Sequence, residues 1–162
     1  MSEAPTLPPA VAAEIGRTYP PVSEVVEAGA VRRYLQAMGE PIERYTAPDR
    51  PDELVHVPPL FLQVLGRQPL GTPPPREDGL GGTMEANEPD LPLRRAVVAG
   101  GEWEFYRPVR IGERITIQMR IANIERKTGR QSGEMYLLTK EMLFLDAAGQ
   151  PVAVWRHFRV RR

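Results

Sequence analysis

The chain contains only two histidines, so acid–base chemistry has few candidate positions. His56 is preceded by Asp52 and Asp49, and a carboxylate that orients an imidazole can make it a general base. His56 is therefore a candidate catalytic base, and the alternative is an ordinary loop histidine. His157 alternates with Phe158 in a predicted strand, so we expect it on the surface or at an interface, without a catalytic role.

A second group of candidates consists of charged side chains near the ends of predicted elements. Glu40 follows Gly39, and its carboxylate either takes part in proton transfer or is a solvated group beyond a helix end. An arginine cluster near the C-terminus could hold phosphate groups, bind a partner's carboxylates or be solvated. This cluster comprises Arg156, Arg159, Arg161 and Arg162.

Because the chain has no cysteine, disulfides, thiol nucleophiles and cysteine-ligated zinc are excluded. We predict no cofactor and no metal site.

Length and charge restrict the class of protein further. A chain of 162 residues suits a single domain. Its 21 lysine and arginine residues balance 21 aspartate and glutamate residues, which argues against a nucleic-acid binder that neutralises phosphates. Zero net charge also gives little repulsion between copies, so we expect an oligomer. The N-terminal residues lack the pattern of a signal peptide and no apolar run could cross a membrane, so we predict a cytoplasmic protein.

The prolines divide the N-terminal half of the chain. Residues 1–21 are rich in proline and predict an arm or a loosely docked lead-in, with room for a short helix near Val11. Residues 22–26 predict a short strand. Residues 27–38 carry apolar side chains at helical spacing and predict a helix. Residues 59–66 predict a second helix that is short, apolar and largely buried, with a proline in its first turn.

The C-terminal half predicts β-structure after a long loop. Residues 68–92 are rich in proline and glycine and predict either a surface excursion or a lid beside a binding site. Alternating apolar and polar residues then predict four strands, at residues 102–106, 114–125, 134–145 and 152–160. Such a sheet would bury its apolar face against the apolar helix. We therefore predict an α+β fold with residues 22–162 as one domain.

The segment from Gly100 to Thr116 carries an aromatic strand, G-G-E-W-E-F-Y, followed by R-P-V-R-I-G-E-R-I-T. It resembles the strand–turn–strand of MaoC-like dehydratases, in particular their N-terminal-type domain related to the fungal fatty-acid synthase dehydratase. Three further stretches agree with this family in order and spacing: residues 26–34, 57–61 and 146–153. The resemblance implies a hot-dog fold, in which an antiparallel sheet wraps around a central helix and the domain pairs with another hot-dog unit.

The resemblance also implies chemistry on acyl thioesters, namely the reversible addition of water to a 2-enoyl-CoA. Active members of the family use an Asp and a His in a G-D-x-N-P-x-H segment after the first helix. Here Glu40 stands where the Asp would be, and no histidine follows it within reach. In the family a backbone N–H at the start of the central helix polarises the thioester carbonyl. Because Pro58 and Pro59 lack an N–H, Leu60 and Phe61 are the first donors available.

These observations lead to three hypotheses about function. The first is a subunit that shapes the acyl pocket and works with a second hot-dog chain, which carries the Asp–His pair. The second is a self-sufficient homodimeric enoyl-CoA hydratase that uses Glu40 or His56. The third is a non-catalytic module that binds or senses acyl-CoA. All three involve an acyl-CoA thioester, and none involves nucleic acid or a membrane. The predicted substrate contacts are Leu60, Phe61, Gly100 and Gly101.

Overall fold

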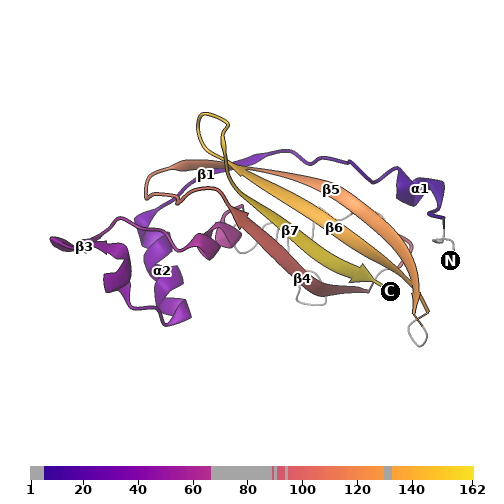
Figure 1. Cartoon of the computed structure of the whole chain (residues 1–162), viewed down its shortest axis with the longest axis horizontal. Coiled ribbons are helices and arrows are strands. Elements are labelled where there is room, and N and C mark those ends of the chain that lie inside the picture. Colours follow the sequence, from indigo (N-terminus) through magenta and orange to yellow (C-terminus); the bar gives the residue numbers. More distant parts are fainter. Residues whose placement is uncertain (1–5, 67–88, 90, 94, 130–132) are drawn as a thin grey trace.

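The computed structural model describes residues 6–66, 89, 91–93, 95–129 and 133–162. Its centre is a five-stranded antiparallel sheet with the strand order β1-β5-β6-β7-β4, and a separate two-stranded sheet pairs β2 with β3. The strands are β1 (Val22–Val25), β2 (Thr46–Ala47), β3 (Arg50–Leu54), β4 (Ala96–Phe105), β5 (Arg114–Gly129), β6 (Gly133–Leu145) and β7 (Pro151–Arg161). The helices are α1 (Pro9–Ala12), α2 (Ala28–Met38) and the short 3-10 helices η1 (Ile42–Tyr45) and η2 (Pro59–Val64). Figure 1 shows the long strands curving side by side, with α2 and β3 at one end of the molecule.

The meander of β5, β6 and β7 forms because each strand alternates apolar and polar side chains. The apolar side chains of all three strands gather on the face that packs against η2, which we call the inner face. Its buried apolar members are Ile115, Ile117, Met119, Ile121, Tyr136, Leu138, Met142, Phe144 and Trp155. The alternation predicted for β5 holds only as far as Ile121. A register shift between Ile121 and Asn123 then turns Ile124 toward the buried side.

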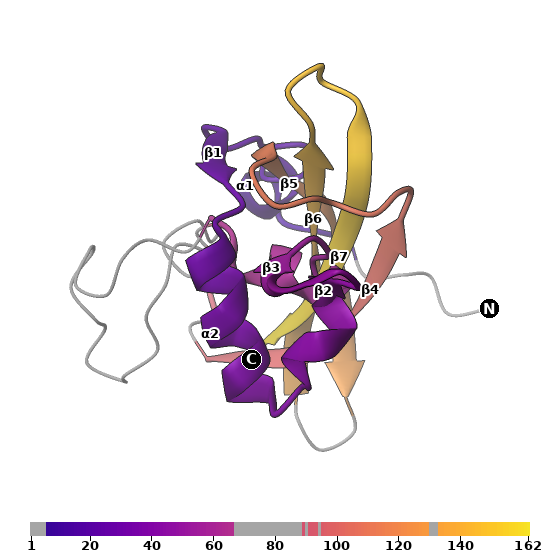
Figure 2. The same ribbon diagram turned by 90° about the vertical axis from the view of Figure 1, so that its left-hand side faces the viewer.

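Helix α2 forms where the sequence predicts a helix. Glu27 precedes its first turn, and Gly39 ends it in the left-handed conformation with φ 68°. Val31 and Leu35, one turn apart, are buried against the sheet. Figure 2 views the molecule from this end, with α2 beside the small β2–β3 sheet.

The second predicted helix differs from the expectation. Residues Pro59–Val64 form the 3-10 helix η2 and not an α-helix, and its first bond runs from the Phe61 N–H to the Pro58 carbonyl at 2.9 Å. Pro58 and Pro59 have no N–H groups to donate. The segment between this proline pair and Gly66 is also short, which favours 3-10 bonding over a run of α-helical hydrogen bonds. Phe61 and Leu62 are buried against the inner face, whereas Leu60 is 46% exposed.

The N-terminal arm is more firmly docked than the sequence predicts. Helix α1 places Val11 in a buried cluster with inner-face side chains of β5 and β6. The following residues run beside β5, with the Gly16 N–H donating to the Ile121 carbonyl at 2.8 Å and the Tyr19 N–H donating to Met119 at 3.0 Å. The arm thus prolongs the edge that β1 forms. The loop predicted at residues 68–92 lies outside the described residues, apart from positions 89, 91 and 92.

Among the described residues no helix is long and apolar enough to cross a membrane.

Candidate functional site

An apolar groove of about 290 Å³ opens between η2 and the end of β4. Its lining residues are Val57, Pro58, Pro59, Leu62, Phe105, Tyr106, Arg107, Pro108 and Val109. The proline pair therefore lies against the R-P-V segment that follows β4, and two stretches that resemble the family by sequence meet in space. The groove could hold an apolar chain, because most of its wall is hydrocarbon.

The two predicted amide donors follow the groove's proline pair in η2, and they are not equivalent. The Phe61 N–H already donates to the Pro58 carbonyl, and its ring packs edge-on against Tyr34 at a centroid distance of 5.6 Å. Among the described residues no group accepts from the Leu60 N–H. Leu60 is therefore the amide at the start of η2 that is available to polarise a carbonyl.

The two candidate proton-transfer residues do not come together. Glu40 is exposed beyond the end of α2, and its carboxylate pairs with Arg44 at 3.4 Å. His56 is exposed and lines a different groove, between α2 and β3. Its backbone N–H donates to the Tyr45 carbonyl at 3.1 Å, and among the described residues no carboxylate hydrogen-bonds to its ring. A self-sufficient enzyme would need an oriented pair of a histidine and a carboxylate, whether it used Glu40 or His56. The described residues assemble no such pair.

Gly100 and Gly101 lie on β4, opposite Phe158 and His157 of β7. Gly100 has φ 136° beside a register shift in the ladder, which favours glycine there. A Cβ on Gly101 would lie 2.8 Å from the Trp155 Nε1 atom, so this glycine permits the indole to cross β4 closely. Gly100 therefore has a conformational role and Gly101 a packing role, and both stand beside the substrate contact predicted for these residues.

An aromatic stack covers the β4 side of the inner face. The Trp103 ring lies between Phe105 and Trp155, with centroid distances of 5.3 and 5.0 Å and nearly parallel planes. The sequence placed Trp103 and Phe105 on one face, and the register of β4 with β7 adds Trp155 directly opposite Trp103. Phe105, at one end of this stack, lines the groove beside η2, and Trp155, at the other end, is buried in the core.

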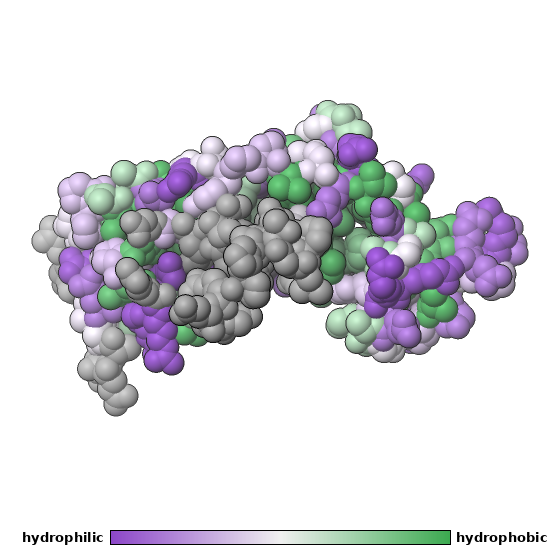
Figure 3. Space-filling model, turned by 180° about the vertical axis from the view of Figure 1, so that it is seen from behind, coloured by the Kyte–Doolittle hydropathy of each residue, from purple (hydrophilic) through white to green (hydrophobic). Residues whose placement is uncertain are grey.

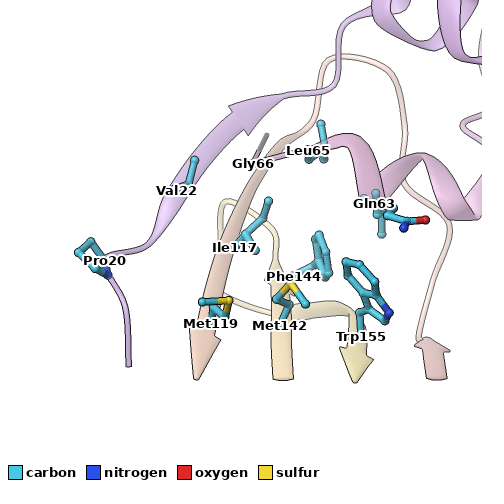
Figure 4. A pocket seen from close by; sticks show the side chains of 11 residues that line it. Pro20, Val22, Gln63, Leu65, Gly66, Ile117, Met119, Met142, Phe144 and Trp155 are labelled. Carbon is cyan, nitrogen blue, oxygen red and sulfur yellow. The ribbon is translucent and has the colours of Figure 1, made fainter. Parts of the chain in front are cut away.

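A small cavity of about 50 Å³ lies beneath η2 on the inner face. Figure 4 shows Trp155, Phe144 and Met142 pointing into it from the sheet, below Leu65 and Gln63. Its walls are almost wholly apolar. It is too small for a long acyl chain without movement of η2, so the larger groove is the better candidate for substrate.

A row of basic side chains occupies the other end of the inner face and corrects two predictions. His157 is 8% exposed and packs its ring against Trp155 at 5.0 Å, so it does not lie on the surface. Lys140 pairs with it across the ladder and is 0% exposed. Arg159 and Arg161 follow on the same face and are also buried, so this part of the arginine cluster is not solvated.

The alternation of β7 carries the signal for this row, because residues 155, 157, 159 and 161 lie on one face of the strand. Phe158 lies on the opposite face and is half-buried, whereas Trp155 is buried on the inner face. His157 is therefore on the same side of β7 as the buried indole.

A polar network fixes the turn beside the groove. Arg107 pairs with Glu113 and with Asp146, each at 3.0 Å. The Asp146 carboxylate also accepts the N–H groups of Gln150 and Ala148 at 2.9 Å. The hydrogen bond from Gln150, the guanidinium of Arg107 and the bond from Ala148 together lower the pKa of Asp146 below its ordinary value.

A curved antiparallel sheet with helical segments against its inner face is a hot-dog-like fold, which confirms the fold predicted from the sequence. Residues 13–154 match the family described as the FAS1-like dehydratase domain region, and the chain belongs to this family.

Three proteins illustrate the relationship. A UPF0336 protein from Streptomyces avermitilis is 29% identical over 123 residues, which cover 71% of this chain and 73% of that protein. The ChsH1-ChsH2 complex from Mycobacterium tuberculosis contains a chain with a TM-score of 0.70 and 16% identity, covering 94% of this chain and 88% of that one. The HadBC (3R-hydroxyacyl-ACP dehydratase) complex from the same organism gives a TM-score of 0.62 at 15% identity, with coverages of 91% and 96%. At these identities the two structures show a shared fold.

Proposed function

We propose that this chain is the acyl-pocket-forming subunit of a heteromeric enoyl-thioester hydratase, and that a second hot-dog subunit supplies the catalytic Asp–His pair. One observation carries the proposal. The groove beside η2 has an apolar wall, and the Leu60 N–H at the start of η2 has no acceptor among the described residues, which nevertheless assemble no pair of proton-transfer groups. The chain can therefore bind and polarise an acyl thioester but lacks the groups that would add water to it.

The groove supports the binding half of this proposal. An acyl chain along Val57, Leu62 and Phe105 would bury apolar surface, which favours binding by about 25 cal/mol per Å². The Leu60 N–H would donate to the thioester oxygen, whose negative charge increases in the enolate-like transition state. Polarisation of the carbonyl speeds hydration only when a general base and a general acid are also positioned at the double bond.

The edge of the sheet supports the partner half. Strand β4 pairs with β7 on one side, and in the described part of the chain no strand pairs with its other side. Val97, Val98, Phe105 and Tyr106 are exposed along it. Because the groove begins at Phe105 and Tyr106, a subunit bound at this edge would place its own residues next to the groove. Two structures of similar fold, ChsH1-ChsH2 and HadBC, are complexes of two named components.

The test is turnover of crotonyl-CoA by the purified chain alone and together with a short hot-dog protein that carries an intact G-D-x-N-P-x-H segment. We expect the chain alone to be slower by about 10²–10⁴, the usual contribution of a positioned acid–base group. In the complex, Glu40→Gln and His56→Ala should leave kcat nearly unchanged, whereas replacing the partner's histidine should abolish it. Brisk turnover by the chain alone that His56→Ala removes would overturn the proposal in favour of a self-sufficient homodimer. Thioester binding without turnover under any pairing would favour a binding module.

The cytoplasmic location stays a prediction, which the absence of cysteine supports.

A further inference from the structure

A second groove, of about 770 Å³, lies between α2, β3 and the turn that follows β4. Its lining residues are Ala28, Arg32, Asp52, Glu53, Leu54, Val55, His56, Pro108, Val109, Arg110 and Ile111. In the space-filling view of Figure 3, hydrophilic residues gather at the end of the molecule that carries β3. Four of the side chains that line this second groove are charged, namely Arg32, Asp52, Glu53 and Arg110, whereas Arg107 is the charged side chain in the lining of the groove beside η2.

Three basic side chains line the second groove from three separate elements. Arg32 lies one turn into α2 and its guanidinium donates to the Asp52 carbonyl, which holds the side chain over β3. Arg110 lies on the turn after β4, and its backbone N–H donates to the Glu113 carboxylate at 2.9 Å, so the turn is fixed while the Arg110 side chain has no acceptor among the described residues. His56 directly precedes the Val57–Pro59 wall of the first groove.

The second groove also holds two carboxylates, and one of them is already paired with an arginine. Glu53 is engaged by Arg50, and Asp52 interacts with Arg32 through its carbonyl oxygen. Asp52 therefore contributes one carboxylate against the guanidinium groups of Arg32 and Arg110. Planar guanidinium groups bind phosphate oxygens through paired hydrogen bonds, and a neighbouring imidazole can add a third donor when protonated.

The two grooves adjoin each other. Pro108 and Val109 line both of them, and His56 and Val57 are adjacent in the chain. A ligand with a phosphate-bearing end and an acyl end could therefore lie with its phosphates beside Arg32 and Arg110 and its thioester near Leu60. Thioester carriers have this shape, because CoA and the prosthetic group of acyl carrier proteins both join a phosphate to a pantetheine arm.

We propose that Arg32, Arg110 and His56 bind the phosphate of a pantetheine carrier, so that this chain, and not its partner, holds the carrier end of the substrate. The inference rests on the proposed function, since it assumes a thioester substrate. It also gives His56 a binding role in place of a catalytic one. The shared chemistry is a phosphate attached to pantetheine, and the source is either CoA or a carrier protein.

The test is the dissociation constant of CoA, of dephospho-CoA and of a phosphopantetheinylated carrier protein, measured by calorimetry on the complex where a partner co-purifies and otherwise on the chain alone. Arg110→Gln should weaken binding by about threefold to tenfold, and the double variant Arg32→Gln with Arg110→Gln by more than tenfold. Lys127→Gln is the matched control, because it removes one positive charge at the far end of β5 and should leave binding unchanged. Pantetheine without phosphate should bind all variants equally.

The pattern of loss identifies the source. Weakening for CoA that is absent for dephospho-CoA and for the carrier protein would place the arginines at the ribose phosphate that dephospho-CoA lacks, and would overturn the assignment to the phosphate on pantetheine. Equal weakening for CoA and the carrier protein assigns the site to the phosphate on pantetheine. If the double variant binds every probe as tightly as the unchanged chain, or if the unchanged chain binds none of them, the inference is wrong. Partner-dependent turnover tests the proposed function separately. It is measured at saturating substrate, where weaker binding of the carrier does not lower the rate.

Discussion

The two edges of the sheet are built differently. At one edge β1 has four residues, and Pro20 and Pro21 interrupt the arm that prolongs it along β5, so this edge offers no long uninterrupted strand for pairing. At the other edge β4 runs for ten residues without proline and exposes Val98 by 61%. Exposed edges attract further strands, and proteins usually shorten or interrupt those that must stay single. For the second subunit that we propose, this difference favours β4 over β1 as the edge of contact.

The strongest test of this comparison replaces one valine at each edge. Val98→Lys should block partner binding through β4 and so reduce partner-dependent turnover by about 10²-fold or more, toward the rate of the isolated chain. Val22→Lys at β1 is the matched control, since Val22 is also partly exposed, at 38%. We expect it to leave both assembly and turnover unchanged. Light scattering measures assembly and a crotonyl-CoA assay measures turnover. Equal effects at the two edges would remove the distinction between them.

The central strands between the two edges contribute most of the buried core, so substitutions there should have the largest effect on the free energy of unfolding. Phe144→Ala removes a buried ring from the centre of the inner face and should lower the free energy of unfolding by about 3–5 kcal/mol. Leu143→Ala, on the half-buried opposite face of the same strand, should cost clearly less in the isolated chain. Urea denaturation of both variants checks the order. A larger loss for Leu143 would mean that a second copy covers the outer face.

Strand β4 depends on glycine for its close contact with β7. Gly101→Ala places a methyl group 2.8 Å from Trp155 Nε1 and 3.0 Å from the Arg156 carbonyl, so the two strands must separate. We expect a loss of about 1–3 kcal/mol, with hydrogen exchange increased in β4 and unchanged in β1. Gly29→Ala in α2 is the control, because its new methyl group meets Arg33 at an ordinary 3.6 Å. That change should be neutral or stabilising.

Acid should loosen the β4 end by a smaller amount. The pKa of Asp146 is lowered by the N–H of Gln150 and by Arg107, which follows β4. A carboxylate with a lowered pKa stabilises the fold at pH values above its ordinary pKa of 3.8, and this contribution disappears as the pH falls through the lower folded value. Asp146→Asn should therefore show weaker acid dependence of the melting temperature below pH 4 than the unchanged chain. Identical acid profiles for the two proteins would contradict this.

Much of the fold follows from local sequence patterns. The apolar spacing of α2 with Gly39 after it, and the alternation in β5 and β6, are both visible without tertiary information. The 3-10 geometry of η2 and the register shift near Asn123 depend on packing against neighbouring strands, which spacing alone does not encode.

The candidate site was predictable only in part. Leu60 and the proline pair were identified through a resemblance, and the structure adds the wall that faces them. Arg32 and Arg110 are far apart in sequence and belong to no motif that names a ligand, so only the fold brings them to one groove. The alternation of His157 with Phe158 does not by itself show which face is buried, and the inner-face position of His157 follows only from the register that sets Trp155 opposite Trp103.

The strand order also has a consequence for how the chain folds. Strands β5, β6 and β7 follow one another with short connections, so their hairpins form at low entropic cost. Each edge strand must instead close a long stretch of chain: β1 pairs with a strand that begins 89 positions after Val25, at Arg114, and β4 pairs with β7 across the whole meander. The central hairpins should therefore form first and β4 should be among the last elements to settle. During synthesis without its partner, the chain would expose a long apolar edge at the end of folding, which favours aggregation. Co-expression with the partner should then raise the soluble yield more than any lowering of temperature.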